Sequence, residues 1–355
     1  MKHKDYWRKR FKLLEESQNK KGLRCYAEIE GHYRRALKEI EGKIAAWYQR
    51  FMSNNNISLQ EARKVLRGRE LAEFKWDVND YIRYGEENAV NQQWMKELEN
   101  ASARHHISWL ESLKLHLQQS LEAMTGNVLD SLDAAMRDIY MDGYCHTAYE
   151  IQKGLGIGWN FASLDEKTIS KVIKTPWAAD GKNFSERVWG NRRKLVNELS
   201  QALTQSIILG EDSQKAIDKV AKKMNASKRN AGRLVMTEKA FFSSAAQKDC
   251  FRELGVERYE VVATLDDVTS PLCRDMDGKH FPMTQYEIGV TAPPFHVYCR
   301  STTVPYFDDD FGATGERAAR GADGKTYYVP ADMTYREWEK LAGINPDGGQ
   351  NAYKI

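Results

Sequence analysis

The chain has 355 residues, of which 41% are hydrophobic and 29% charged, and its formal net charge is +3. This length favours two or three domains over a single core, and the composition is typical of a folded, helix-rich protein rather than a disordered one. No apolar run reaches the length of a transmembrane helix, and the basic start MKHKDYWRKRFKLLEE is not followed by the apolar segment of a signal peptide. The five cysteines are an odd number spread along the chain, which favours folding in a reducing cytosol over a disulfide framework.

The charge is distributed in blocks. Residues 1–50 contain 14 Lys/Arg and 7 Asp/Glu, whereas residues 51–166 contain 11 and 18. Residues 167–252 are strongly basic, with 18 against 8, and residues 266–355 are acidic, with 9 against 14. Such blocks indicate surfaces that face different partners. The basic block can attract nucleic acid; the alternative is a solvated helix face.

Residues 1–153 are predicted to form an N-terminal region of long helices packed side by side. Apolar residues recur at three- and four-residue spacing, which is typical of one buried helix face. The first such stripe contains Ile44, Trp47, Tyr48, Phe51 and Met52. The run Asn54–Asn56 interrupts this stripe, and the capping box of Ser58 and Glu61 then predicts a new helix. A second stripe contains Trp94, Met95, Leu98, Ile107, Leu110, Leu113 and Leu117.

Residues 154–255 are predicted to form a basic helical domain, either a hairpin or a small bundle. The closely spaced Gly154, Gly156 and Gly158 lack the spacing of a phosphate-binding loop and predict a hinge. A helix capped by Ser185 is expected to end at Gly210 and to be followed by a short helix. Ser227 is expected to cap a further helix that runs to Gly255. Basic side chains on these helices are candidates for contact with phosphates. They are Lys215, Lys219, Lys222, Lys223, Lys228 and Arg229.

Residues 256–310 are predicted to form a compact β-containing module, so the expected fold class is mainly α with a small α+β module. From residue 258 apolar and polar residues alternate, which predicts a strand. The sequence CRDMDGKHF predicts a β-hairpin that turns at Asp277-Gly278. Residues 300–306 predict another strand.

The remaining residues, 311–355, are predicted to form a C-terminal tail. Asp323-Gly324 predicts a further hairpin. A short helix is expected near residues 335–341, and the glycine-rich end is expected to be mobile.

The densest chemistry lies between residues 264 and 306. His296 and Cys299 are three residues apart and, with Cys273, form a candidate zinc site. Zinc prefers four ligands in a tetrahedral arrangement, but the fourth position of a C-x-x-C pair is occupied by Ser270. His280 or Asp266 are candidates for the missing ligand. The structural alternative is a pair of buried thiols with a histidine that forms a hydrogen bond across the loop.

Two catalytic interpretations of the same segment are weaker. Carboxylates at positions 266, 267, 275 and 277 are candidate ligands for the metal ions of a two-metal nuclease. Such a site needs carboxylates from separate elements, however, and Asp277 is expected to form part of the turn. A nucleophile–base pair of His296 with a cysteine lacks an evident orienting partner. Thr237-Glu238 lies on a helix, where Glu238 is expected to be solvated or to form an ion pair, for example with Arg233.

A family resemblance is carried by the stretch TEKAFFSSAAQKDCFRELGVERYEVVATLDDVTSPLCRDMDGKHF and the following APPFHVYCRSTTVPY. Together they resemble the phage minor head (head morphogenesis) protein family, which includes the F protein of phage Mu. The resemblance covers about residues 175–307. Many members have cysteine where Ser270 stands here. The matching residues are Thr237, Glu238, Leu265, Asp266, Thr269, Cys273, Asp277, Gly278, Lys279, Pro293, Pro294, His296, Cys299 and Arg300.

The resemblance implies a low-copy structural protein of the virion interior, present in the host cytoplasm during assembly. Such proteins associate with the portal and with other capsid or scaffold proteins, and some contact the packaged double-stranded DNA. The basic helices would then face DNA or an acidic portal surface. No catalytic role and no membrane span are expected. The alternative is a metal-dependent nuclease or a toxin-like effector that uses residues 264–306, because some family domains are fused to toxin modules.

Overall fold

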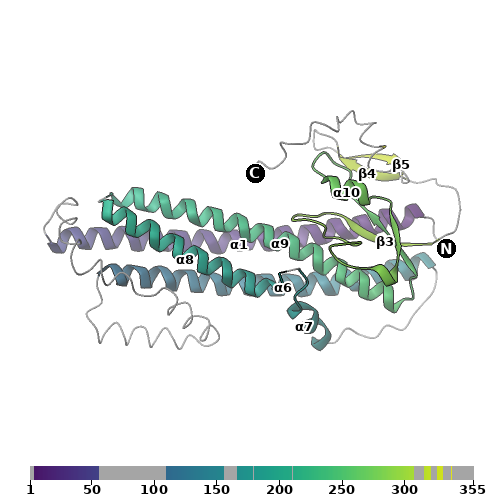
Figure 1. The fold of residues 1–355 in the computed structure, drawn as a ribbon, viewed down its shortest axis with the longest axis horizontal. Helices are drawn as coiled ribbons and strands as arrows, with labels where there is room; N and C mark the ends of the chain where they lie inside the picture. Colours follow the sequence, from purple (N-terminus) through teal and green to yellow (C-terminus); the bar gives the residue numbers. More distant parts are fainter. Residues whose placement is uncertain are drawn as a thin grey trace. The chain divides into compact units, whose positions relative to one another are not determined.

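A computed structural model describes residues 4–55, 109–155, 166–178, 180–209, 211–307, 316–320, 326–330 and Glu337. The chain divides into two compact units, and Figure 1 labels the helices and strands of the described residues. Unit 1 comprises Met1–Cys25, Asp133–Asn183 and Arg233–Ile355, and unit 2 comprises Tyr26–Leu132 and Phe184–Gly232. This grouping differs from the consecutive regions 1–153, 154–255, 256–310 and 311–355 of the sequence prediction, because three long helices contribute to both units.

The described helices confirm the prediction of a mainly α fold. They are α1 (Lys4–Asn55), α6 (Trp109–Leu155), α7 (Glu166–Lys174), α8 (Phe184–Leu209) and α9 (Ser213–Glu253). As predicted, α1 ends at the asparagine run. In the part of the chain that the structure describes, no helix has the length and apolar character needed to cross a membrane.

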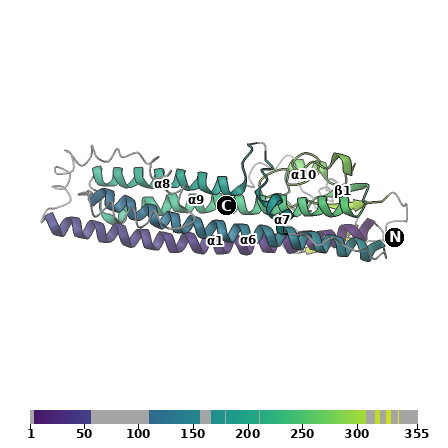
Figure 2. The same ribbon diagram turned by 90° about the horizontal axis from the view of Figure 1, so that it is seen from below.

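Helix α6 runs alongside α1 in the opposite direction (Figure 2). In unit 1 the direction follows from two side-chain contacts. Arg10 binds Glu150, whereas Gln18, further along α1, donates to Asp142, which comes earlier in α6. In unit 2 Lys43 donates to Ser120, which continues the same antiparallel order.

The buried face of α1 repeats every 11 residues. Because 11 residues make three turns of about 3.67 residues, such a face stays nearly in line along a long helix. The same spacing separates Leu117, Val128 and Ile139 in α6. The repeat lets one helix present a continuous buried face to both units. In α1 the three rows are Trp7, Gln18, Ile29 and Ile40; Phe11, Gly22, Tyr33 and Ile44; and Leu14, Cys25, Ala36 and Trp47.

Helix α9 is a single helix of 41 residues, so the predicted break before Ser227 is wrong. Ser227 is buried inside the helix, and its hydroxyl forms a hydrogen bond with the Tyr33 hydroxyl of α1, 3.0 Å away. A serine side chain that finds a partner on a neighbouring helix does not need to cap its own. The predicted end of the helix is confirmed, since Gly255 follows with φ +68°, the left-handed conformation that glycine adopts most readily.

The prediction of a small β-containing module is confirmed in unit 1. Strands β1 (Arg258–Val262), β2 (His280–Pro282) and β3 (Thr302–Tyr306) form an antiparallel sheet in the order β2-β1-β3. The 3-10 helix η1 (Met283–Gln285) follows β2. Strands β4 (Glu316–Arg320) and β5 (Thr326–Pro330) pair with each other, in agreement with the expected hairpin around Asp323-Gly324.

The predicted hairpin at Asp277-Gly278 is wrong in its first arm. Residues Pro271–Met276 form a short helix, α10, and only the second arm is a strand. Ser270 caps the helix by accepting from the Cys273 N–H, and proline at the first helical position suits a helix start. The expected turn remains, because Gly278 has φ +78° and its N–H donates to Val261.

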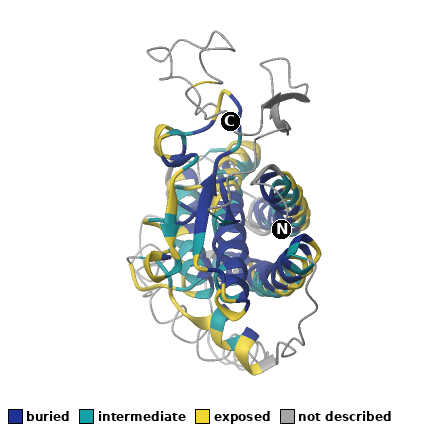
Figure 3. Ribbon diagram, turned by 90° about the vertical axis from the view of Figure 1, so that its right-hand side faces the viewer, coloured by how far each residue is buried: buried dark blue, intermediate teal, exposed yellow. Residues whose placement is uncertain are grey.

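The sheet packs on the C-terminal part of α9 and the first turns of α1 (Figure 3). All but the first residue of β1 are buried, including Glu260, which pairs with Arg8 of α1. The strand predicted from residue 258 is therefore confirmed, and its polar residue Glu260 is buried because α1 supplies Arg8 as its partner.

Several predicted features lie outside the described residues. These are the capping box at Ser58 and Glu61, the first part of the second apolar stripe, Gly156 and Gly158 of the expected hinge, and nearly all of the expected helix near residues 335–341.

Candidate functional site

Three side chains with soft metal-binding atoms meet at the surface of the β-containing module. Cys273 comes from α10, and His296 and Cys299 come from the loop that leads into β3. The Sγ atoms of Cys273 and Cys299 are 3.7 Å apart, and Nε2 of His296 is 3.0 Å from the Cys273 sulfur. All three ligand atoms lie within 4.8 Å of one another. The structure thus brings together the three residues that the sequence singled out.

The His296 ring is held in one orientation by its other nitrogen. Nδ1 lies 2.7 Å from the Val297 carbonyl oxygen, which can only accept, so Nδ1 carries a proton and donates it. In the neutral ring the lone pair is then on Nε2, which faces the sulfur atoms. A backbone carbonyl that accepts from the other ring nitrogen and so fixes the tautomer is typical of histidines that bind metals.

The two thiols differ in acidity because they share a proton. The hydrogen bond with Cys273, aided by His296 and two backbone N–H groups, lowers the pKa of Cys299 well below its usual value. The same contact with Cys299, together with burial, raises the pKa of Cys273. The Cys299 sulfur also raises the pKa of His296. The arrangement therefore favours a thiolate at Cys299, the form in which cysteine binds metals.

The cluster is largely closed off by apolar neighbours. Cys273 and Cys299 are almost fully buried and pack with Ala263 at the end of β1, and Phe295 lies against them. His296 is half-buried. Beside Cys299, Tyr298 has φ +62°, a conformation that non-glycine residues rarely adopt. The surrounding loop holds this conformation and so directs the sulfur inward while the tyrosine side chain is exposed.

The carboxylates near the cluster have structural partners. Asp266 accepts from both Arg300 guanidinium nitrogens and from the Thr269 hydroxyl. Asp277, at the end of α10, accepts from the Ala263 N–H at 2.8 Å. Both side chains therefore fix the loops that carry the cluster and are not part of it. In the described parts of the chain, the cysteine–histidine cluster is the only group of three or more potential metal ligands.

His280 does not join the cluster. It is exposed in β2, and its ring stacks on Tyr306, with ring centroids 4.4 Å apart. The stacking follows from the strand order, because His280 is in β2 and Tyr306 is in β3, the two strands that flank β1. His280 and Asp266, the two candidates for a fourth ligand, are both outside the cluster. The Ser270 side chain caps α10.

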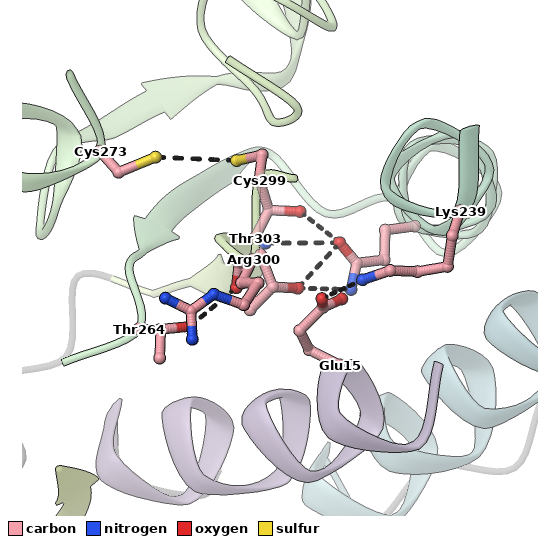
Figure 4. A network of polar contacts seen from close by, with 9 residues as sticks. Glu15, Lys239, Thr264, Cys273, Cys299, Arg300 and Thr303 are labelled. Carbon is pink, nitrogen blue, oxygen red and sulfur yellow. Dashed lines mark hydrogen bonds and ion pairs between the residues drawn. The ribbon is translucent and has the colours of Figure 1, made fainter. Parts of the chain in front are cut away.

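A buried polar network lies behind the cluster, where α1, α9 and β3 meet (Figure 4). Lys239 of α9 donates to Glu15 of α1, and both side chains are almost completely buried. Gln247 of α9 donates to the Thr302 hydroxyl at 2.9 Å and accepts from the Thr303 hydroxyl at 2.8 Å. It also accepts from the Thr303 N–H at the edge of β3. Sequence reasoning missed these residues because Lys, Glu and Gln are typical of surfaces.

One of the two expectations for Glu238 is wrong. The solvated alternative does not hold, because Glu238 is buried in α9 and accepts from the Trp177 indole N–H at 2.9 Å. Trp177 also stacks on Phe241, one turn along α9, with ring planes 9° apart. Thr237 forms a hydrogen bond with the Arg233 carbonyl of its own helix. Glu238 and Phe241 thus anchor the segment after α7 onto α9.

The basic residues singled out in the sequence lie on the N-terminal half of α9, in unit 2. Lys215, Lys222 and Arg229 are exposed. The other three form ion pairs with glutamates on neighbouring segments: Lys219 with Glu211, Lys223 with Glu198 and Lys228 with Glu30. Part of the positive charge is therefore neutralised within the protein.

Two comparisons with known proteins found similarity. Residues 197–304 match the family described as Phage Mu protein F like protein. The chain is 25% identical over 244 residues to the Minor head protein GP7 of Bacillus phage SPP1, a match that covers 63% of this chain and 76% of that protein. No solved structure matches this chain. The matched residues 197–304 extend from the C-terminal part of α8 through the cluster to β3.

Proposed function

We propose that this chain belongs to the phage minor head (head morphogenesis) protein family and is a structural protein of a phage head, as supported by the match of residues 197–304 and by the similarity to a minor head protein. The observation that carries the proposal is the extent of this match, which includes α9 with Lys239 and Gln247 of the buried polar network, and the cysteine–histidine cluster. Family membership also supports the sequence-based prediction that the protein is not an enzyme. Its partners are then other proteins of the capsid.

Within the head, the proposed position is the interior, in association with the portal, after assembly in the host cytoplasm. The division of the chain supports this proposal. Unit 1 holds the sheet and the cluster, whereas unit 2 is built from helices and exposes basic side chains on α9. Separate surfaces of different charge suit a protein that joins two kinds of partner.

Co-expression with the portal protein of the same phage tests the portal contact. The full chain is expected to co-purify with the portal oligomer at moderate salt. A charge-reversed variant, Lys215→Glu with Lys222→Glu, is expected to lose this association if the basic face of α9 carries it, whereas Lys20→Glu on α1 serves as the matched control. Failure of the unaltered chain to co-purify at any salt concentration would overturn portal association.

Double-stranded DNA is a second candidate partner for the same basic face. The exposed side chains of Lys215, Lys222 and Arg229 support contact with DNA, whereas the ion pairs of the neighbouring lysines reduce the positive charge available for this contact. Contact with phosphates predicts affinity that falls steeply as salt rises, because bound counterions are released. Retention on a DNA column should weaken between low and moderate salt and should weaken further in the charge-reversed variant. Retention that does not change with salt would argue against phosphate contact.

The cysteine–histidine cluster fits a zinc ion with three protein ligands. The fixed tautomer of His296 leaves Nε2 available, and Cys299 is disposed to be a thiolate. Such a site would leave a fourth position for water or for a group from a partner. Bound zinc would tie α10 to the loop before β3 and stabilise the module. Elemental analysis of the purified chain should find about one zinc per chain, reduced to background in Cys299→Ser; equal zinc in that variant would exclude the cluster as the site.

The alternative of a metal-dependent nuclease receives less support from the geometry. Such enzymes use converging carboxylates, but Asp266 and Asp277 are engaged with Arg300 and the Ala263 N–H. Nuclease activity that disappears on chelation and returns with metal would revive this alternative.

A further inference from the structure

Two buried thiols face each other across the loops of the module. Cys273 and Cys299 are 26 positions apart in the sequence, yet their sulfur atoms are 3.7 Å apart, which is van der Waals contact. A disulfide bond requires a separation of about 2.05 Å between the sulfur atoms. The remaining distance must be closed by side-chain rotation and a small movement of α10, a helix of six residues bounded by loops on both sides.

We propose that Cys273 and Cys299 form a reversible intramolecular disulfide when the protein meets a hydroperoxide. In the first step one thiol attacks the peroxide oxygen, giving a sulfenic acid and, from hydrogen peroxide, one water. In the second step the other thiol attacks the sulfenic sulfur, forming the S–S bond and releasing a second water. Two thiols are oxidised by two electrons and one peroxide is reduced to two waters, so the step balances.

The surroundings of the pair favour this product over other oxidation products. Both sulfur atoms are almost fully buried and are 3.7 Å apart, so a sulfenic acid on one of them is in contact with the other thiol. His296, which lies 3.0 Å from the Cys273 sulfur, is only half-buried, and we infer that a small oxidant enters on this side. A neighbouring thiol that captures the sulfenic acid is the arrangement found in reversible thiol switches.

The consequence is a covalent link between α10 and the start of β3. Closing a loop of this length restricts the unfolded chain and stabilises the folded module. If the protein resides in a virion, as proposed above, it passes from a reducing cytosol to an oxidising medium when the particle leaves the cell. The link would then lock the module after assembly. The cross-link itself does not depend on the proposed location, and it excludes zinc binding by the same thiols.

The other cysteines provide internal controls. Cys25 and Cys250 are buried, whereas Cys145 is exposed on α6. An unspecific oxidation would therefore modify Cys145 first, since exposure governs access to the oxidant. A link between Cys273 and Cys299 formed while Cys145 remains a thiol would be a property of the cluster.

The test uses the full chain, reduced and freed of metal by a chelator. The protein is exposed to hydrogen peroxide, unfolded in the presence of a thiol alkylating agent and digested without reductant. Mass spectrometry should find a peptide pair joined through Cys273 and Cys299, with two of the five thiols lost to alkylation, and dithiothreitol should restore both. Prior loading with zinc should protect the pair. Cys145→Ser should form the same link.

Three results would overturn the proposal. These are full alkylation of Cys273 and Cys299 after peroxide, their conversion to sulfinic or sulfonic acids without a link, and links that join either residue to Cys145 or to another chain. Because the readout is made on the unaltered chain, it does not depend on whether a cysteine variant folds. Co-purification with the portal is measured separately, so failure of either proposal leaves the other standing.

Discussion

The two halves of α9 place the same helix in two different environments. In unit 2 the half from Ser213 to Gly232 buries one face and exposes lysines on the other. In unit 1 the half from Arg233 to Glu253 is buried on nearly every side, because the sheet covers the face that would otherwise be solvated. The difference shows that polar side chains on one helix become surface charges or core contacts according to what packs against them.

The partners of the polar residues differ accordingly. In the buried half, Lys239 pairs with Glu15, and Gln247 satisfies the edge of β3. In the exposed half, Lys223 pairs with Glu198 while both keep substantial contact with water. Surface ion pairs contribute little to stability, whereas a buried charge that loses its partner is costly. The comparison therefore predicts large effects of substitution in unit 1 and small ones in unit 2.

The largest effect is expected for Lys239→Met. It leaves the Glu15 carboxylate buried without its cation, which should lower the free energy of unfolding by about 3–5 kcal/mol. The matched change Lys223→Met in the exposed half should cost less than about 1 kcal/mol. Urea unfolding of the purified chains, followed by circular dichroism, measures both.

The double variant Lys239→Met with Glu15→Leu provides the control for charge. Removing both members of a buried pair is often nearly neutral, so this variant should recover most of the lost stability. Equal effects of Lys239→Met and Lys223→Met would show that the two halves of the helix are not different environments in solution.

A smaller loss is expected for Gln247→Leu. The side chain keeps a similar size, but the Thr303 N–H and the Thr302 hydroxyl lose the Gln247 amide, whereas the Thr303 hydroxyl keeps its contact with the Tyr286 hydroxyl. Leaving such groups unsatisfied in the core costs about 1–3 kcal/mol. Gln214→Leu is the control in the other half of α9, because Gln214 is exposed and donates to Asp218 of its own helix. Similar unfolding midpoints for the two variants would contradict the role of Gln247 in closing the sheet edge.

Much of the fold could be predicted from the sequence because local signals agree with tertiary packing. The asparagine run ends α1, Gly255 ends α9, and β1 follows where the apolar period changes. Predictions failed where a distant partner overrides a local signal. Ser227 resembles a helix cap, but the Tyr33 hydroxyl on α1 satisfies it within a continuous helix. The 11-residue period of α1 was a usable signal for long helices that three- and four-residue spacing alone does not reveal.

The candidate site was predictable in its residues but not in its surroundings. Spacing identified Cys273, His296 and Cys299, which the structure brings together. It could not exclude His280, because only the strand order shows that this residue lies on the sheet edge away from the cluster. Nor could it find Lys239, whose burial depends on α1 supplying Glu15 from 224 positions away.

Gly232→Ala tests the packing of α9 against α1 within unit 2. An added methyl group would lie 2.6 Å from the Tyr26 ring of α1, too close without a shift of one helix. Overpacking of this kind costs about 1–3 kcal/mol, partly offset by the gain of about 1 kcal/mol that alanine brings to a helix. Gly42→Ala on α1 meets no atom within 4 Å and should stabilise instead. Thermal unfolding should shift in opposite directions for the two variants, and a stabilised Gly232→Ala would show that the contact with Tyr26 is loose.

The smallest effect is expected for the ion pair between Glu150 and Arg10 in unit 1, in which the carboxylate is buried and the guanidinium is partly exposed. Glu150 is buried, which raises its pKa, but the hydrogen bond and charge of Arg10, helped by Tyr6, outweigh burial and lower the pKa overall from its usual value of 4.5. A lowered carboxyl pKa contributes stability above that usual value, and this contribution is lost as the pH falls through the lower folded pKa. Because Arg10 is partly exposed, the contribution should be about 1 kcal/mol or less.

The melting temperature of the unaltered chain should exceed that of Glu150→Gln at pH 7 and at pH 5, and the difference should shrink below pH 4 or so. A difference that persists unchanged into strong acid would mean that packing, and not charge, holds Glu150 in place.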